Sequence, residues 1–321
     1  MANYIVDRKQ FALTKEGTRG TVETTPARWL YVARDAELAY GLEHVDFDRI
    51  ASQGSGEFAP EAGRKVGKGK FTMDLEAQTI GEVLNSLLGS YSGSQVSTST
   101  AYTHTFTKTS STQHPGYTLF AERGVDYFGY NLGICKSLEI SLDSKGKAQA
   151  STEWLMKNEQ TRAASTATLP TPDPLMFYQA QVEIDDTTAG SRIGALKLKI
   201  DNGAEALWRY NQSQNCDDII VAKRPMIEGG FDMYFTSTSE RADFLANTSR
   251  KIELNITGDQ IGATGAYFRF LASMYACKYT AVPFDSELEG LLGASVAFKS
   301  FYSLSDSKAI DIVIGNTSTT Y

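Results

Sequence analysis

The feature that most constrains the fold is alternation of apolar and polar residues with a period of two. In Leu138–Leu142 every second residue is apolar, and the pattern recurs in Leu196–Ile200, Ile252–Ile256 and Phe71–Glu76. Such alternation places one face of a strand on a core and the other in water or against a polar partner. The sequence therefore predicts a mainly β fold built from half-buried, mainly antiparallel sheets.

Two segments carry a helical pattern instead. The first is Thr79–Leu88, which Gly89 follows as a stop signal, and the second is Ser239–Ala246. The apolar residues of the first helix recur at helical spacing on one face: Ile80, Val83, Leu84, Leu87 and Leu88. We expect one helix beside the sheets in each half of the chain.

The segment Asn158–Pro174 divides the chain into two nearly equal parts. It contains three of the eight prolines and a single large apolar residue, Leu169. This composition is typical of an extended, semi-rigid linker. A length of 321 residues also fits about two domains at roughly 150 residues each. We therefore predict domains at 1–157 and 175–321, joined by a proline-rich linker at 158–174.

Weak internal similarity suggests that the halves arose by tandem duplication. Lys68–Ser90 resembles Glu228–Arg250, with an offset of 160 residues between Phe71 and Phe231. A later segment, Ile134–Trp154, resembles Ala276–Phe298, and there Cys135 falls on Cys277 with an offset of 142. The segments occur in the same order in both halves.

Two long segments precede the matched strands and read as loops. They are Ile50–Gly67, which is rich in Gly, Ser and Ala, and Asn211–Pro225. Loops of this length inside a compact domain are usually functional or disordered. Their equivalent positions in the two halves favour function.

Charge and composition exclude several classes of protein. With 31 basic and 38 acidic residues, the net charge of −7 argues against an ordinary nucleic-acid-binding surface, although it permits a protein that tolerates DNA without gripping it. The three cysteines cannot form a disulfide framework and no pair has the Cys-x-x-Cys spacing. We expect them to be buried small residues. No long apolar run or signal-like start is present, so we expect no membrane segment and a reduced, intracellular place of assembly.

No catalytic or cofactor-binding motif survives inspection. In Gly63–Lys70 a Walker loop would need glycine where Arg64 stands. The acidic pairs at 185–186 and 217–218 do not fit an EF-hand and read as solvated turn acids. No Gly-x-Ser-x-Gly elbow occurs, and three histidines are few for a metalloenzyme. We therefore predict no enzymatic activity, no cofactor and no metal site.

Several short stretches, in this order, are similar to the tail tube protein (major tail protein) of long-tailed bacteriophages. They are Lys15–Thr21, Trp29–Val32, Gly69–Glu76 with the helix ending at Gly89, Tyr102–Thr107, Tyr117–Glu122, Ser137–Leu142 and Ile200–Gly203. No stretch is diagnostic alone, and their order and spacing carry the resemblance.

The resemblance implies a β-sandwich or barrel tube domain with one flanking helix. It implies rings in which inner strands of neighbouring subunits join into a β-barrel around a channel, and a loop that reaches the next ring. Two tube domains per chain would make the ring a trimeric pseudo-hexamer, which we favour over a hexamer, although both stay open.

The function implied is structural. Stacked rings would form the hollow tail tube through which DNA is ejected without specific binding. The other implied partners are the tape measure, tail terminator and distal tail proteins. The implied location is the virion tail, after assembly in the host cytoplasm. The alternatives are a β-sandwich binding or adhesin module of a virion, and a ring protein of a secretion-apparatus tube.

Two sets of residues are candidates for these roles. Polar positions of the alternating strands are expected to face the channel or a neighbour: Thr72, Asp74, Glu76, Glu139, Ser141 and Asp232. Residues of the two long segments are expected to contact the adjacent ring: Phe58, Arg64, Lys65, Asn215, Asp217 and Asp218.

Overall fold

The computed structural model describes residues 9–46, 60–97, 99–124, 126–143, 146–189, 192–234, 238–263, 265–283, 286–288 and 291–321. Over these ranges the chain is mainly β, with two α-helices and one short 3-10 helix. This confirms the predicted fold class. No sheet closes into a barrel within the described ranges; the sheets are large and antiparallel.

The elements of the two halves are as follows. The N-terminal half contains β1 (Gln10–Lys15), β2 (Arg28–Leu30), β3 (Glu37–Val45), β4 (Glu61–Asp74), α1 (Ile80–Leu88), β5 (Gly89–Gln95), β6 (Tyr102–Lys108), β7 (Tyr117–Glu122), β8 (Tyr127–Asp143), β9 (Gln149–Met156) and β10 (Asn158–Thr161). The C-terminal half contains η2 (Phe177–Gln179), β11 (Ala180–Ile184), β12 (Thr187–Thr188), β13 (Ile193–Asp201), β14 (Ala204–Leu207), β15 (Asp218–Val221), β16 (Met226–Tyr234), α2 (Ser239–Ala246), β17 (Arg250–Gln260), β18 (Tyr267–Ala281), β19 (Ser286–Leu288), β20 (Leu291–Phe301) and β21 (Ile310–Asn316).

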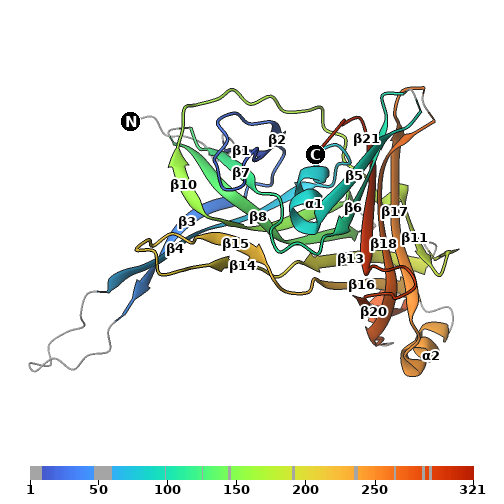
Figure 1. Cartoon of the computed structure of the whole chain (residues 1–321). Helices are drawn as coiled ribbons and strands as arrows, with labels where there is room; N and C mark the ends of the chain where they lie inside the picture. The colour runs from blue at the N-terminus through green and yellow to red at the C-terminus, as the bar shows by residue number, and fades with distance from the viewer. Residues whose placement is uncertain are drawn as a thin grey trace, which may run out of the picture.

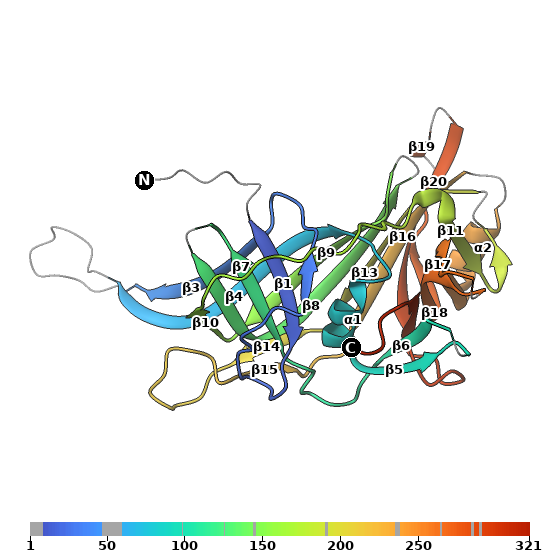
Figure 2. The ribbon, with the colours of Figure 1, turned by 90° about the horizontal axis from the view of Figure 1, so that it is seen from above.

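A single antiparallel sheet of eight strands runs through both halves, and we call it the central sheet. Its order is β3-β4-β9-β8-β13-β16-β20-β18. Figure 2 shows these strands side by side across the width of the molecule. The halves meet where β8 pairs with β13, from Ser137 opposite Asp201 to Asp143 opposite Ala195.

Two side sheets share the longest strands with the central sheet. Strand β8 also pairs with β7 and β10, and β7 continues to β1 and β2. Strand β18 also pairs with β17 and β21, which continue to β11 and to β6. Figure 1 shows the second of these sheets turned steeply away from β13 and β16. Strands of 17 and 15 residues thus belong to two sheets at once.

One hydrophobic cluster joins the apolar face of the central sheet to residues of both halves. Phe71, Met73 and Leu75 are buried as the alternation predicts, with at most 3 % of their surface exposed. The predicted linker begins as strand β10, which pairs with β8, so its first four residues are not linker. The proposed domain boundaries remain a prediction.

Helix α1 lies on the apolar face of the central sheet, and all nine of its residues are buried. Gly89 ends it in the left-handed region (φ 81°), as the stop signal predicts. Two of its buried polar side chains have partners within the chain: Asn85 Nδ2 donates to Tyr117 Oη (2.9 Å), and Ser86 Oγ accepts from the Cys135 amide (2.9 Å). Helix α2 also has the predicted bounds but lies largely exposed.

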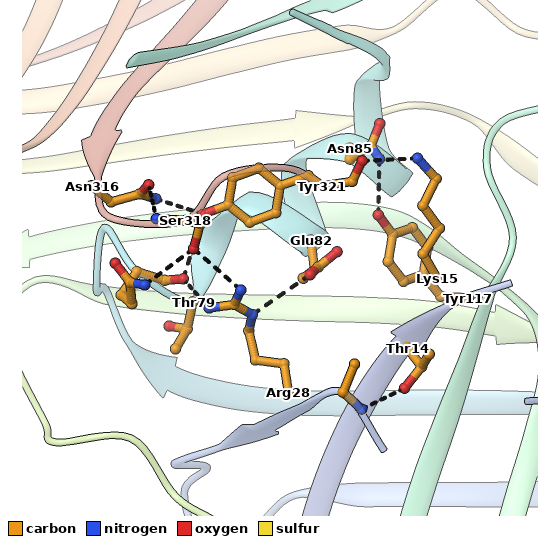
Figure 3. Close-up of polar contacts among 12 residues, drawn as sticks. Thr14, Lys15, Arg28, Thr79, Glu82, Asn85, Tyr117, Asn316, Ser318 and Tyr321 are labelled. Carbon is orange, nitrogen blue, oxygen red and sulfur yellow. Dashed lines mark hydrogen bonds and ion pairs between the residues drawn. The ribbon is translucent and has the colours of Figure 1, made fainter. Parts of the chain in front are cut away.

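The end of the C-terminal half is anchored on the N-terminal half (Figure 3). Lys15 Nζ donates to the Tyr321 carbonyl (2.9 Å), and Arg28 donates to Ser318 Oγ (3.2 Å) while pairing with Glu82 (3.5 Å). The Tyr321 ring occupies the space that a Cβ at residue 81 would need, which explains a glycine there. The halves are therefore held together by polar contacts as well as by the shared core.

His114 predicts a stability that depends on pH. The imidazole is buried, its Nδ1–H donates to the Ser86 carbonyl (2.8 Å) and its Nε2 lies 2.8 Å from Lys108 Nζ. Burial, together with the Lys108 charge, lowers its pKa to about 4. Between pH 6.5 and 4 the unfolded chain binds a proton that the folded chain does not, so stability falls as the pH falls. At pH 7 this shift contributes about 3 kcal/mol to the free energy of unfolding.

The measurement is denaturant unfolding at pH 7 and pH 5 for the wild type and His114→Asn, whose amide can still donate to Ser86. The variant is expected to lose less stability than the wild type on acidification. Burial raises the pKa of Glu16, Glu76 and Glu82, which acts in the opposite direction and is common to both proteins. If the stability of the two proteins depended equally on pH, His114 would not be the source of the pH dependence.

Candidate functional site: the polar face of the central sheet

The face of the central sheet opposite the hydrophobic cluster is polar, and its residues lie in cross-strand rows. Because opposite residues of antiparallel strands share a face, the pairing registers define each row directly. The first row runs through Thr72, Ser151, Glu139, Lys199, Glu228 and Lys299. The second runs through Asp74, Gln149, Ser141, Lys197, Gly230 and Ala297. In a third, Asp232 lies between Ala195 and Ser295.

Positive and negative charges alternate along the first row from β8 to β20, and β18 then places Lys278 opposite Lys299. Glu139 lies opposite Lys199, Lys199 opposite Glu228, and Glu228 forms an ion pair with Lys299 (3.1 Å). In the second row Asp74 pairs with Lys147 (2.6 Å), and in the third Ser295 Oγ donates to Asp232 (2.5 Å). Exposed pairs of this kind add little stability. Lys197 stands opposite Ser141 and Gly230, so the face carries cations with and without a carboxylate opposite them. The face is thus hydrophilic without being strongly basic or acidic.

Five of the six channel-facing candidates from the sequence lie together on this face, and Glu76 does not. Strand β4 ends at Asp74. Residues 173–175 lie against the chain just after it, where the Leu175 amide donates to the Leu75 carbonyl (2.9 Å). Glu76 is 4 % exposed and its carboxylate accepts from the Asp173 amide (3.3 Å) and Thr79 Oγ1 (3.4 Å). The expectation for Glu76 is therefore corrected.

Sequence reasoning missed several charged residues of the same face: Lys197, Lys199, Glu228 and Lys299. The alternation in Leu196–Ile200 already contained the signal for the two β13 lysines. That these lysines stand opposite Glu139 and Ser141 depends on the pairing of β8 with β13, which no local pattern specifies.

Not all of the ring-stacking candidates lie in the loops in which the sequence places them. Phe58 lies outside the described residues. Arg64 and Lys65 belong to strand β4 and not to a loop, because residues 61–67 pair with β3 in a hairpin that projects from the body (Figure 1). The Arg64 guanidinium lies 4.8 Å from the centre of the Trp208 ring.

The second long segment folds back against this hairpin and contains strand β15. The Lys65 amide donates to the Gln214 carbonyl (2.8 Å), and Tyr40 Oη donates to Asn215 Oδ1 (2.6 Å). Beneath it, β14 and β15 form a second small core with Val66, Leu132 and Ile134. The described residues 60–67 of the first segment and the second segment thus form one packed region.

The two acids of this region have partners in the chain. Asp218 forms an ion pair with Arg19 and accepts from Gln113 Nε2 (3.2 Å). Asp217 Oδ1 accepts from Asn211, and Lys157 donates to the Asp217 carbonyl (2.8 Å). They are structural groups of the subunit, whatever else they contact.

The described residues contain no cluster of His, Cys, Asp and Glu able to hold a metal ion. All three cysteines are free and buried, as expected, and burial raises the pKa of Cys216 to about 11. None of the helices in the described ranges is long and apolar enough to cross a membrane.

Comparison with protein families decides the class. A family model described as phage tail tube protein matches residues 7–299. The chain belongs to the phage tail tube protein family. Comparison with curated proteins found no match.

Family membership confirms the resemblance drawn from the sequence and makes this a structural protein of a phage tail. The match extends over both halves and contains every strand of the central sheet except the last two residues of β20. The polar face of this tail tube protein therefore lies within the matched region.

Proposed function

We propose that this tail tube protein polymerises as stacked homo-oligomeric rings, and that the polar face of the central sheet lines the channel through which DNA leaves the virion. Assembly would take place in the host cytoplasm, with other tail proteins at the tube ends. The observation that carries the proposal is a repeat of strand pairings between the two halves, because a repeat that extends one sheet can be continued by further copies.

The repeat is visible in the topology. The N-terminal pairings β1–β2, β1–β7, β3–β4, β4–β9, β7–β8 and β8–β9 correspond to β11–β12, β11–β17, β13–β16, β16–β20, β17–β18 and β18–β20. In each half the helix follows the second strand of the central sheet. The correspondence supports the proposed duplication.

Residue-level details support the same correspondence. Gly69 stands opposite Trp154, and Gly229 stands opposite Phe298, so that a glycine pairs with an aromatic residue in both halves. A bulge lies between Cys135 and Ser137 in β8, and another between Tyr279 and Ala281 in β18. These registers support an offset of 144 between β8 and β18, so Cys135 corresponds to Tyr279 and not to Cys277.

The width of the sheet favours three chains per ring. Each chain contributes eight strands to the central sheet, so three copies contribute 24. At a strand spacing of about 4.8 Å and a tilt of about 40°, a 24-stranded barrel has a backbone radius of about 24 Å. Six copies would double that radius, and two would give only the 16 strands of a solute pore. A trimeric ring suits a channel for a single duplex.

The charge pattern suits passage without binding. Affinity for DNA grows with each phosphate that a basic side chain neutralises. On the polar face the row lysines at 199 and 299 lie beside Glu139 and Glu228. Cations already paired with carboxylates are poor partners for phosphate, so DNA would slide.

Reversing the acids of the first row should convert this face into a DNA-binding one. The variant Glu139→Lys with Glu228→Lys makes the row basic, and we expect tubes that assemble but bind DNA with a salt dependence steeper by about 0.9 per added phosphate contact. The matched control is Glu183→Lys with Asp259→Lys, which changes the net charge equally on other strands. Equal DNA binding by both variants would count against the channel assignment.

The direct test is negative-stain electron microscopy of the purified protein over a concentration series. Rings or hollow tubes are the expected result, with three chains per ring by light scattering. Compact monomers at every concentration, with or without other tail proteins, would contradict the proposal and favour a discrete binding module.

A further inference from the structure

One pairing of the central sheet has no counterpart within the chain. Strand β8 pairs with β13, and the corresponding pairing would join β18 to β3. Among the described residues β3 pairs only with β4, and β18 beyond Cys277 pairs only with β20. The two strands are the opposite ends of the central sheet, so a single chain cannot bring them together. Open edges of this kind invite pairing with another chain.

We infer that the outer edge of β3 pairs antiparallel with the end of β18 in a second copy of this chain, with Gly41 opposite Ala281, Tyr40 opposite Val282 and Ala39 opposite Pro283. This rests on the proposed ring assembly and adds its register. The register follows from the internal junction, where Asp201, Ile200 and Lys199 lie opposite Ser137, Leu138 and Glu139. Each residue of β13 corresponds to the residue of β3 that lies 160 positions earlier, and each residue of β8 corresponds to the residue of β18 that lies 144 positions later. Applied to these three pairs, the two offsets give the three proposed pairs.

Hydrogen-bond directions agree with this register. At the internal junction the Asn202 amide donates to the Lys136 carbonyl (3.0 Å), so every second residue from Asn202 points its amide across the junction. The equivalent residues of β3 are Leu42, Tyr40 and Leu38, and of these the Leu38 carbonyl already accepts from Arg123 and from Tyr130 Oη (3.4 Å) within the chain. An independent contact supports the same orientation of the Leu42 amide. The Lys65 amide, opposite Leu42, bonds to Gln214 and not to β3, so Leu42 and Lys65 form a non-hydrogen-bonded pair. The Leu42 amide therefore faces the outer edge.

Pro283 fits the same register. Pro283 corresponds to Glu139. In β8 the neighbours of Glu139 bond across the internal junction, while Glu139 itself faces the other neighbouring strand. The backbone nitrogen of Pro283 would therefore face β20 and not the neighbouring copy. A proline there removes no bond to the neighbouring copy. Proline is tolerated at strand ends and edges, where its missing donor is not needed.

The side chains also match by face. Val282 is buried and Tyr40 half-buried, and both would continue the apolar face that Leu138 and Ile200 form at the internal junction. Ala39 and Pro283 would continue the polar face. Gly41 and Ala281 are exposed in the single chain and would come opposite each other. The junction therefore extends both faces of the sheet without a break.

Cysteine cross-linking tests the register. The pair Gly41→Cys with Ala281→Cys occupies a non-hydrogen-bonded position, where Cα atoms lie about 4.5 Å apart, within the range for a disulfide. A Cβ at Gly41 meets its nearest atom at 3.9 Å, and the three native cysteines are buried. Oxidised glutathione would be added to assembled protein. We expect a non-reducing gel to show covalent multimers that end at one closed ring, whose size gives the number of chains.

The matched control moves one cysteine four residues along the strand, as Glu37→Cys with Ala281→Cys. It is expected to give at least tenfold less cross-linked product. Rings seen by microscopy with equal, low cross-linking in both variants would overturn the register while the tube function stands. Failure of the wild type and both variants to form rings or cross-links would overturn the proposed function as well.

Discussion

Leu42→Pro is expected to give a folded subunit that no longer forms rings. The Leu42 amide faces the outer edge of β3, so proline at this position removes no hydrogen bond within the chain. The side chain is 38 % exposed, so its loss empties no core. Across the proposed junction the same amide would donate to the Thr280 carbonyl of the next copy, and a proline ring would meet that carbonyl instead.

The expected loss of ring stability is large because the substitution weakens every junction between copies in the ring. One hydrogen bond contributes about 0.5–1.5 kcal/mol, and the steric clash adds to this at each junction. We expect the concentration needed for ring formation to rise at least tenfold, measured by light scattering and negative-stain microscopy. Circular dichroism and thermal unfolding should match the wild-type monomer.

The control for this variant is Leu42→Ala, which removes the same side chain and keeps the amide. It should form rings at the wild-type concentration. If Leu42→Pro also did so, β3 would not be the edge that joins neighbouring copies. If the alanine variant failed equally, the side chain and not the backbone would carry the contact.

Local patterns in the sequence sufficed for the elements that depend on near neighbours. Both helices were predicted with bounds within one residue, and for α1 the helical spacing and the glycine at its C-terminus are local signals. The burial of Phe71 and Met73 followed from alternation alone. The polar face was found at five of six positions for the same reason.

Elements fixed by distant partners were not predictable. Residues 61–67 are rich in Gly, Arg and Lys, and they are a strand because β3 supplies the partner. Strand β10 lies in a segment with a linker composition for the same reason. Glu76 is buried by residues 173–175, almost 100 positions away in the sequence. The order of the eight strands, and so the junction itself, is likewise a long-range property.

Gly229→Val is expected to destabilise the subunit more than valine at Gly69 or at Gly41. A Cβ at Gly229 would lie 2.3 Å from Phe298 Cζ and 2.9 Å from the Lys197 carbonyl oxygen. The ring is buried and the carbonyl belongs to β13, so neither can move freely. Overpacking of this kind costs about 1–3 kcal/mol, and the two extra methyl groups of valine place the expected loss near the upper end.

The surroundings of the other two glycines predict an order of stability loss for valine at the three positions. At Gly69 the nearest atom to a new Cβ is Leu38 Cδ2 at 2.5 Å, the tip of a side chain that can rotate, so Gly69→Val should cost less. At Gly41 the nearest atom is 3.9 Å away, so valine there meets open space in a strand and should be neutral or slightly stabilising. Urea midpoints measured below the ring-forming concentration would give the order. If Gly229→Val and Gly41→Val unfolded together, the ring of Phe298 could not lie over Gly229 as the register requires, and the correspondence between Gly229–Phe298 and Gly69–Trp154 would lose its support.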